Sequence, residues 1–135
     1  MIYIDGCAKG NPGPAAIGIY ICDEYGNVLY RGGEYLGEKT NQEAEYGAVL
    51  KALNVAPAHC THDVEIYSDS QLVVKQMNRQ FRIRKKHLLD IHKEIRNCEK
   101  IFKSVQYIQV EKEHPNIEIA DQLAHDAIKR TLRGG

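Results

Sequence analysis

Four acidic residues stand where a charged side chain is costly, and they are the part of this sequence best suited to chemistry. They are Asp5, Glu45, Asp69 and Asp121. Asp5 follows the apolar residues 2–4 inside a predicted strand, where an uncompensated buried carboxylate costs on the order of several kcal/mol. Taken singly, each carboxylate has a simple structural explanation: it could lie on a solvent-exposed strand face, at a rim position or at a helix cap.

The helix predicted after residue 40 separates two neighbouring glutamates by role. Thr40 and Glu43 have the spacing of a capping box, in which each side chain bonds the other residue's backbone N–H. Glu43 therefore has a local role at the helix end. Glu45 instead has helical spacing to Ala48 and Ala52, which places it on the face that packs against the sheet.

The two remaining aspartates occupy comparable positions. Asp69 ends a predicted strand where a helix begins, which is the place where α/β sheets gather their binding groups. Asp121 shares a helical face with the apolar residues Ile117, Ala124 and Ile128. No Arg or Lys is placed in the same way, so four clustered carboxylates would repel one another unless a cation neutralised them.

A hard divalent cation fits such a group. Mg²⁺ and Mn²⁺ prefer oxygen ligands, whereas zinc prefers His or Cys, and neither residue type joins the four carboxylates. Mg²⁺ also takes much of its coordination shell from water and phosphate oxygens. The carboxylates therefore indicate a phosphate-containing substrate and the two-metal arrangement of nucleases and polymerases.

Hydrophobic periodicity and turn residues predict the elements that position these side chains. After a first strand containing Asp5 comes a turn at residues 10–14. The order predicts an α/β fold, with a mixed five-stranded sheet of three antiparallel strands and then two strands in α/β units, flanked by helices. The expected single domain covers residues 1–132, with a disordered tail at residues 133–135. Further strands are expected at residues 15–22, 28–36, 64–68 and 105–110, and helices at residues 41–56, 70–77, 85–100 and 116–132.

Composition adds little about function, but the local charge does. The 135 residues include eighteen basic and eighteen acidic ones, so the overall charge indicates no polyanionic partner. The four cysteines have no zinc-site spacing, which favours reduced thiols in a cytoplasmic protein, and no apolar run reaches membrane-spanning length. We expect a monomer. One run of a single sign breaks the balance, and it comprises Lys75, Arg79, Arg82, Arg84, Lys85 and Lys86.

Several short motifs together resemble type 1 ribonuclease H. They are Asp5-Gly6 followed by Gly10-Asn-Pro-Gly13, Thr40-Asn41 with Glu45, Ser68-Asp-Ser-Gln71, and Ala120-Asp121-Gln-Leu-Ala124. Each motif is weak alone, but all four occur in the family's order over about residues 1–130, which makes the combination specific. The resemblance implies the ribonuclease H fold and cleavage of the RNA strand of RNA–DNA hybrids.

The resemblance also implies roles for individual residues. Asp5, Glu45, Asp69 and Asp121 would hold two Mg²⁺ or Mn²⁺ ions, with Asp5 between them, and cleavage would leave 5′-phosphate and 3′-hydroxyl ends. Asn11 and Thr40 match parts of a pocket for a phosphate of the DNA strand. Substrate contacts are implied for Gly6, Cys7, Asn11, Asn41, Gln42 and Gln71.

This sequence departs from the best-known bacterial members in one insertion. Those members carry a tryptophan-containing basic protrusion, whereas this chain has no Trp and resembles the shorter subgroup without it. The basic run can supply the missing charge. A run of one sign close to Asp69 favours contact with a phosphate backbone, so we assign Arg82, Arg84 and Lys85 to hybrid binding, with a solvated helix face as the alternative.

A second departure concerns the loop before the last helix. Many relatives carry there a glycine-containing loop whose His assists metal exchange or product release. This chain has the shorter sequence Glu111-Lys-Glu-His114-Pro-Asn116, and His114 is the candidate for that role. The alternative to an active nuclease is a catalytically weak or inactive nucleic-acid-binding protein with the same fold.

Overall fold

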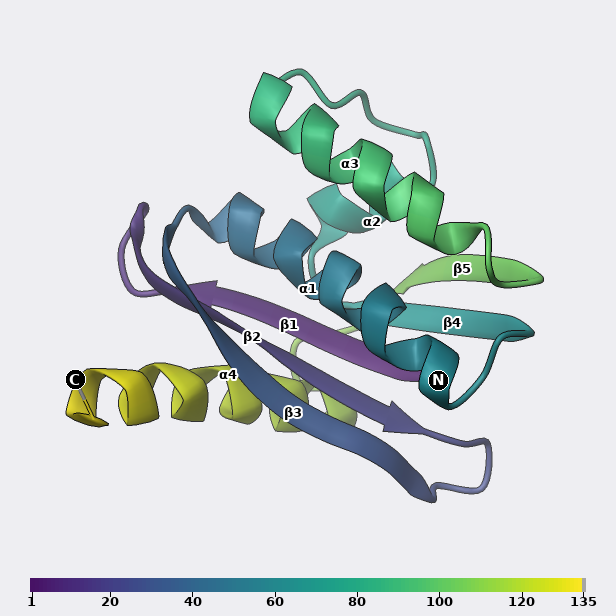
Figure 1. Ribbon diagram of the computed structural model, residues 1–135, viewed down its shortest axis with the longest axis horizontal. Coiled ribbons are helices and arrows are strands. Elements are labelled where there is room, and N and C mark those ends of the chain that lie inside the picture. Colours follow the sequence, from purple (N-terminus) through teal and green to yellow (C-terminus); the bar gives the residue numbers. More distant parts are fainter. Residues whose placement is uncertain (135) are drawn as a thin grey trace.

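The computed structural model describes residues 1–134, whose five strands form one sheet in the order β3-β2-β1-β4-β5 (Figure 1). Antiparallel pairing joins β1 to β2 and β2 to β3, while parallel pairing joins β1 to β4 and β4 to β5. The predicted mixed five-stranded sheet is therefore confirmed. The strands are β1 (Ile2–Ala8), β2 (Gly13–Cys22), β3 (Val28–Lys39), β4 (Asp63–Ser68) and β5 (Ser104–Gln109).

The first three strands are longer than their sequence predicted. The antiparallel register of β1 with β2 continues to the pair Ala8↔Ala15, and that of β2 with β3 continues to Gly13↔Lys39. Backbone hydrogen bonding between strands thus overrides the turn propensity of Gly13 and Pro14. The remaining turn is closed by a hydrogen bond of 2.8 Å from the N–H of Lys9 to the carbonyl of Pro14.

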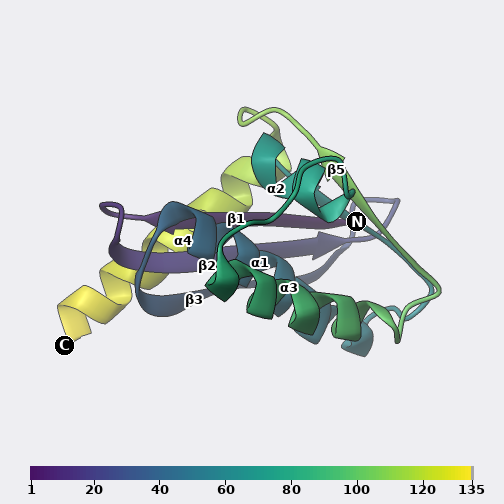
Figure 2. The same cartoon turned by 90° about the horizontal axis from the view of Figure 1, so that it is seen from above.

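Helix α1 (Asn41–Val55) lies across one face of the sheet (Figures 1 and 2). It begins with the predicted capping box, because Thr40 Oγ1 accepts from Glu43 N at 3.1 Å and Glu43 Oε1 accepts from Thr40 N at 2.9 Å. Such a cap contributes about 1 kcal/mol. The alternating residues Ile2 and Ile4 of β1 point toward α1 and form the main core with its apolar stripe.

The same side of the sheet carries a short 3-10 helix and two further α-helices. A short 3-10 helix (Ala56–Ala58) ends α1, and α2 (Gln71–Met77) follows β4. Helix α3 (Lys86–Glu99) packs on α1 and forms an outer layer, which Figure 1 shows above α1. Leu88 and Ile95 of α3 are fully buried, and Ile91 and Cys98 are partly buried against the same core.

Helix α4 (Pro115–Gly134) covers the opposite face, as Figure 1 shows below the sheet. Its approach to the sheet is very close. A Cβ atom at Gly18 of β2 would lie 1.8 Å from the backbone oxygen of Ala120, and one at Gly33 of β3 would lie 2.3 Å from that of Leu123. Only glycine at these two positions lets α4 pack at this depth.

The expected disordered tail at residues 133–135 is wrong in part. Helix α4 continues through Arg133 and Gly134, because no proline or helix-ending residue precedes Gly134, and residue 135 lies outside the described residues. All four cysteines are free thiols within residues 1–134. In the same part of the chain, the helices are too short or too polar to cross a membrane.

Candidate metal centre

Three of the four candidate carboxylates meet where β1 and β4 separate, and Asp121 borders a hollow beside them. These parallel strands pair only at Ile2↔Ile66 and Tyr3↔Tyr67, so Asp5 lies just beyond their last paired residues. Asp69 follows directly on β4. The sheet thus opens a fork, and both aspartates line it.

Glu45 reaches the same fork because α1 starts in contact with β1. A Cβ atom at Gly6 would lie 2.5 Å from the carbonyl carbon and oxygen of Ala44 and 2.7 Å from the N of Glu45. Glycine at position 6 therefore brings the first turn of α1 against the strand that carries Asp5. This contact brings the carboxylate of Glu45, on the helix, close to that of Asp5, on the sheet.

Carboxylate oxygens of Asp5, Glu45 and Asp69 lie within 4.8 Å of one another. Asp5 is 6% exposed, although it carries an ionisable group. Oε2 of Glu45 is buried and has no hydrogen-bond partner among the described residues. An unpartnered buried oxygen facing two other carboxylates is the donor arrangement expected for a hard divalent cation.

Asp121 comes from α4 and lies outside the group of three carboxylates within 4.8 Å. It lines a hollow of about 490 Å³ together with Asp5 and Asp69. Its Oδ1 also lies 3.2 Å from Nε2 of His125, one turn further along the helix. Asp121 remains more exposed than Asp5, with 44% of its side-chain surface accessible.

The electrostatics of the cluster disfavour four free negative charges. Burial is the largest cause of the raised pKa of Asp5, and the neighbouring Asp121, Glu45 and Asp69 raise it further. Burial and the charge of Asp69 raise the pKa of Glu45 to about 8. Burial also raises the pKa of Asp69, although its own backbone N–H and Lys112 act in the opposite direction. A bound cation would remove this cost.

A second hollow of about 430 Å³ joins the metal side of the site to the start of α1. It brings together five residues that the sequence assigned to substrate: Asn11, Thr40, Asn41, Gln42 and Lys85. Glu45 and Asp69 form its inner wall. The loop before β2 is tied to the helix start here, because Asn41 N donates to Asn11 Oδ1 at 3.0 Å.

The other predicted substrate residues, Gly6, Cys7 and Gln71, line neither of these two hollows. Gly6 is buried under α1, and Gln71 is the exposed first residue of α2. Cys7 is half-buried beside α4, where burial and the charges of Asp5 and Asp121 raise the pKa of its thiol to about 11.

The basic run turns away from the metal centre over part of its length. Lys85 lines the second hollow, which is the cleft at the start of α1. Arg82 instead borders a separate hollow with Phe81 and Ile83. Arg84 is exposed between them. The structure therefore places the assigned basic residues on two sides of one loop.

His114 is placed at the start of α4. Its Nδ1 accepts a hydrogen bond from Asn116 N at 3.1 Å, and its carbonyl accepts one from Glu118 N at 3.0 Å. Its ring centre lies 5.0 Å from that of Tyr3. These contacts give His114 a capping and packing role, beside the functional role that its sequence position suggested.

Sequence reasoning missed several residues that line the site. Lys112 and Glu118 border the same hollow as Asp5 and Asp121. The signal for Glu118 was available, since it lies three residues before Asp121 and therefore on the same helix face. Lys112 lies in a loop, and no sequence pattern indicates that it is close to Asp69.

A mixed sheet with an acidic cluster at the fork of two parallel strands, and helices on both faces, defines the ribonuclease H fold. The chain belongs to the reverse transcriptase-like family, whose model matches residues 3–127.

Curated relatives match the chain as part of longer proteins. Ribonuclease HI of Halobacterium salinarum is 44% identical over 75 residues, which are 56% of this chain and 38% of that protein. The bifunctional protein Rv2228c of Mycobacterium tuberculosis is 30% identical over 129 residues, or 95% of this chain and 35% of its own length. The chain thus spans little more than a third of these two relatives.

Solved structures match nearly end to end. The crystal structure of RNase H1 from Halobacterium salinarum has a TM-score of 0.89 at 33% identity, covering 96% of both chains. LC11-RNase H1, solved in complex with an RNA/DNA hybrid, has a TM-score of 0.90 at 34% identity and covers 97% of both chains. These similarities extend over the strands and helices that carry all four carboxylates.

Proposed function

We propose that this chain is an endoribonuclease that hydrolyses the RNA strand of RNA–DNA hybrids, leaving 5′-phosphate and 3′-hydroxyl ends. The observation that carries the proposal is the cluster of Asp5, Glu45 and Asp69 within 4.8 Å, at the end of a cleft lined by amide and hydroxyl groups. The similarity to a structure solved with an RNA/DNA hybrid supports this choice of substrate. Because one chain supplies every carboxylate, the proposed site needs no second copy of the chain to complete it.

The donor set fits Mg²⁺ or Mn²⁺. Asp5, Glu45, Asp69 and Asp121 would hold two ions, and the unpartnered Oε2 of Glu45 supports this assignment. When bound, such ions lower the pKa of the attacking water and neutralise charge on the leaving 3′ oxygen.

The chain's own residues bind and orient the hybrid. Asn11, Thr40 and Asn41 line the cleft and present amide and hydroxyl groups to a phosphate of the DNA strand. For Gly6, Cys7, Gln42 and Gln71 the proposed role is recognition of the 2′-hydroxyls of RNA by small polar groups and backbone amides. Gln42 supports it by lining the same hollow as Glu45 and Asp69. Catalysis then depends mainly on holding the scissile phosphate in place.

Charge reversal at Arg82 and Arg84 is expected to weaken hybrid binding more than turnover. Each lost phosphate contact releases one counterion fewer, so KM should rise about tenfold and the slope of log KM against log salt should fall by about 2. Steady-state cleavage at several salt concentrations measures both quantities. The matched control is charge reversal at the exposed Lys129 and Arg130 of α4. An equal effect in the control would assign the result to net charge alone.

Replacing Mg²⁺ or Mn²⁺ by Ca²⁺ separates a nuclease from a hybrid-binding protein without catalysis. Ca²⁺ takes about six to eight oxygens at longer distances, so it can occupy the carboxylates without aligning water and phosphate. Cleavage should stop in Ca²⁺ while hybrid affinity persists, and the cut should fall only in the RNA strand. Equal affinity in all three ions with no product in any of them would refute the nuclease and leave a binding protein.

A further inference from the structure

The end of helix α2 is hydrogen-bonded to three other elements, two of which supply side chains and one a backbone carbonyl. Arg96 of α3 donates from Nη2 to the carbonyl of Met77 at 2.6 Å, and Asn78 donates from Nδ2 to the carbonyl of Tyr107 in β5 at 3.0 Å. From α1, the hydroxyl of Tyr46 donates to Oε1 of Gln76. The last turn of α2 is therefore bonded to α3, to β5 and to α1.

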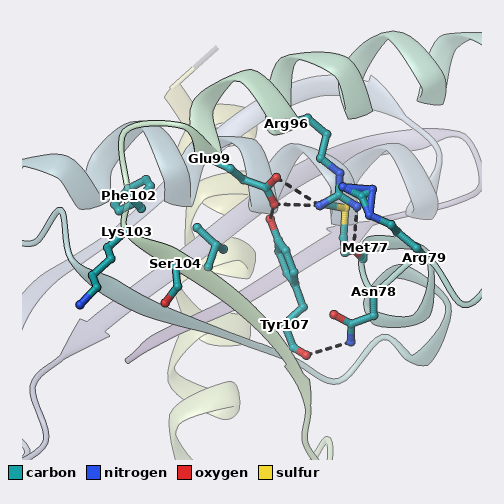
Figure 3. A pocket seen from close by; sticks show the side chains of 10 residues that line it. Met77, Asn78, Arg79, Arg96, Glu99, Phe102, Lys103, Ser104 and Tyr107 are labelled. Atoms are coloured by element: carbon teal, nitrogen blue, oxygen red, sulfur yellow. Dashed lines mark hydrogen bonds and ion pairs between the residues drawn. The ribbon is translucent and has the colours of Figure 1, made fainter.

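Arg96 is committed to this internal role. Figure 3 shows its guanidinium directed toward Glu99 and Met77, with the ring of Tyr107 extending toward the same glutamate. Arg96 Nη1 lies 2.9 and 3.2 Å from the two oxygens of Glu99, and the Tyr107 hydroxyl donates to Glu99 at 2.6 Å. The hollow of about 420 Å³ beside them is thus bordered by a guanidinium that already has a carboxylate partner.

Gln76 is the buried polar centre of the arrangement, with 7% of its surface exposed. Its amide is used at both ends, because Oε1 accepts from Tyr46 and Nε2 donates to the carbonyl of Arg82 at 3.4 Å. Tyr46 is fully buried, and burial raises the pKa of its hydroxyl, which therefore remains a donor. The carbonyl of Arg82 can only accept, so it takes the Nε2 end of the Gln76 amide, and the Tyr46 hydroxyl holds the Oε1 end by donating to it.

The contact partner of Gln76 lies in the loop of residues 79–85, here called the basic loop. Arg79 opens this loop with φ of 62°, a left-handed conformation that usually requires glycine. Ile83 is 9% exposed and anchors the middle of the loop in the core. Arg82, Arg84 and Lys85 keep exposed side chains on this anchored backbone.

We propose that Gln76, oriented by Tyr46, is a positioning residue for hybrid binding, because it holds the basic loop in the conformation that meets the phosphates. A loop that is ordered before binding avoids the entropy loss of ordering its long cationic side chains on the substrate. The proposal rests on the proposed function, since the hybrid is the ligand that the basic loop contacts.

The test compares Tyr46→Phe, Gln76→Met and the double variant with the wild-type chain. Each single variant should raise KM, and the Kd for hybrid measured in Ca²⁺, by about five- to tenfold while kcat changes less than about twofold. The double variant should match the single ones, because both changes break one chain of hydrogen bonds. Limited trypsin digestion should cut after Arg79, Arg82 or Arg84 about tenfold faster in all three variants.

A matched control removes another tyrosine hydroxyl. Tyr67→Phe deletes a hydrogen bond of 3.0 Å to Glu65, far from the basic loop in sequence, and should leave both KM and the trypsin pattern unchanged. The melting temperature of each variant confirms that it is folded at the assay temperature. A general loss of stability would speed trypsin cleavage throughout the chain, and such a result would overturn the proposal.

The outcomes separate this proposal from the proposed function. A wild-type chain that neither cleaves nor binds hybrid refutes both. If the wild type cleaves and Gln76→Met keeps its KM, Gln76 has no positioning role, whatever the trypsin pattern. A fall in kcat at unchanged KM would also overturn the proposal, because it would place the effect at the metal centre.

Discussion

Replacing Asp5 or Asp69 by asparagine is expected to abolish hybrid cleavage while the chain remains folded. Both side chains contribute oxygens to the cluster within 4.8 Å, and an amide cannot supply the negative charge that holds a divalent cation. We expect kcat/KM to fall by at least about 100-fold. Cleavage of a labelled hybrid at saturating Mg²⁺ or Mn²⁺ measures this loss.

The same variants should be as stable as the wild type, or more stable, when metal is removed. The pKa of Glu45 is raised from 4.5 to about 8, so the contribution of Glu45 to the stability of metal-free protein is fully present below about pH 4.5 and is lost as the pH rises toward 8. Removing the neighbouring charge of Asp69 lessens that loss. Urea unfolding in chelator at about pH 7.5 would show a higher free energy of unfolding.

Glu43→Gln is the matched control for these carboxylates. Glutamine can still accept the hydrogen bond from Thr40 N that completes the capping box, so cleavage should stay within about twofold of the wild-type rate. A near-native rate in Asp5→Asn or Asp69→Asn would show that the assigned cluster is wrong. Loss of cleavage in Glu43→Gln would mean that Glu43 has more than a structural role.

Gly18→Ala is expected to cause the second large effect, although Gly18 touches no substrate. The added Cβ would lie 1.8 Å from the backbone oxygen of Ala120, so α4 must move away from the sheet. Overpacking of this kind costs about 1–3 kcal/mol or more. Because Gly18 is paired with Asp5 and Ala120 precedes Asp121, the shift also separates two members of the cluster.

The activity of Gly18→Ala should therefore fall even where the variant is folded. A displacement of about 1 Å in a catalytic group can cost about 100-fold in rate. Gly32→Ala is the control, because its added Cβ would meet the movable hydroxyl of Tyr30 rather than backbone. Unfolding curves and kcat measured together check the prediction. A folded Gly18→Ala variant with native kcat would show that the close packing of α4 does not position Asp121.

Local patterns predicted what depends on neighbours along the chain. The capping box joins residues three positions apart, and helical spacing alone separated Glu45 from Glu43. The order of strands and helices was also predicted, since each element has its own periodicity. Glu45 and Asp121 could be recognised because each is a charged residue on an otherwise apolar helix face.

Features that depend on distant contacts were not predicted. The fork between β1 and β4 is set by the register Tyr3↔Tyr67, which no local pattern specifies. Gly18 and Gly33 resemble ordinary strand glycines until α4 is packed against them. The same holds for Lys112, whose effect on Asp69 arises only in the fold.

The place of Asp121 on α4 has a consequence for synthesis of the chain. During translation, the strand that carries Asp5 is synthesised before α4. Asp121 joins the other carboxylates only when α4 docks against β1 and β2. A nascent chain that has folded its sheet but not yet received α4 would hold an incomplete set of ligands. We therefore expect the proposed nuclease activity to appear only after translation has passed α4.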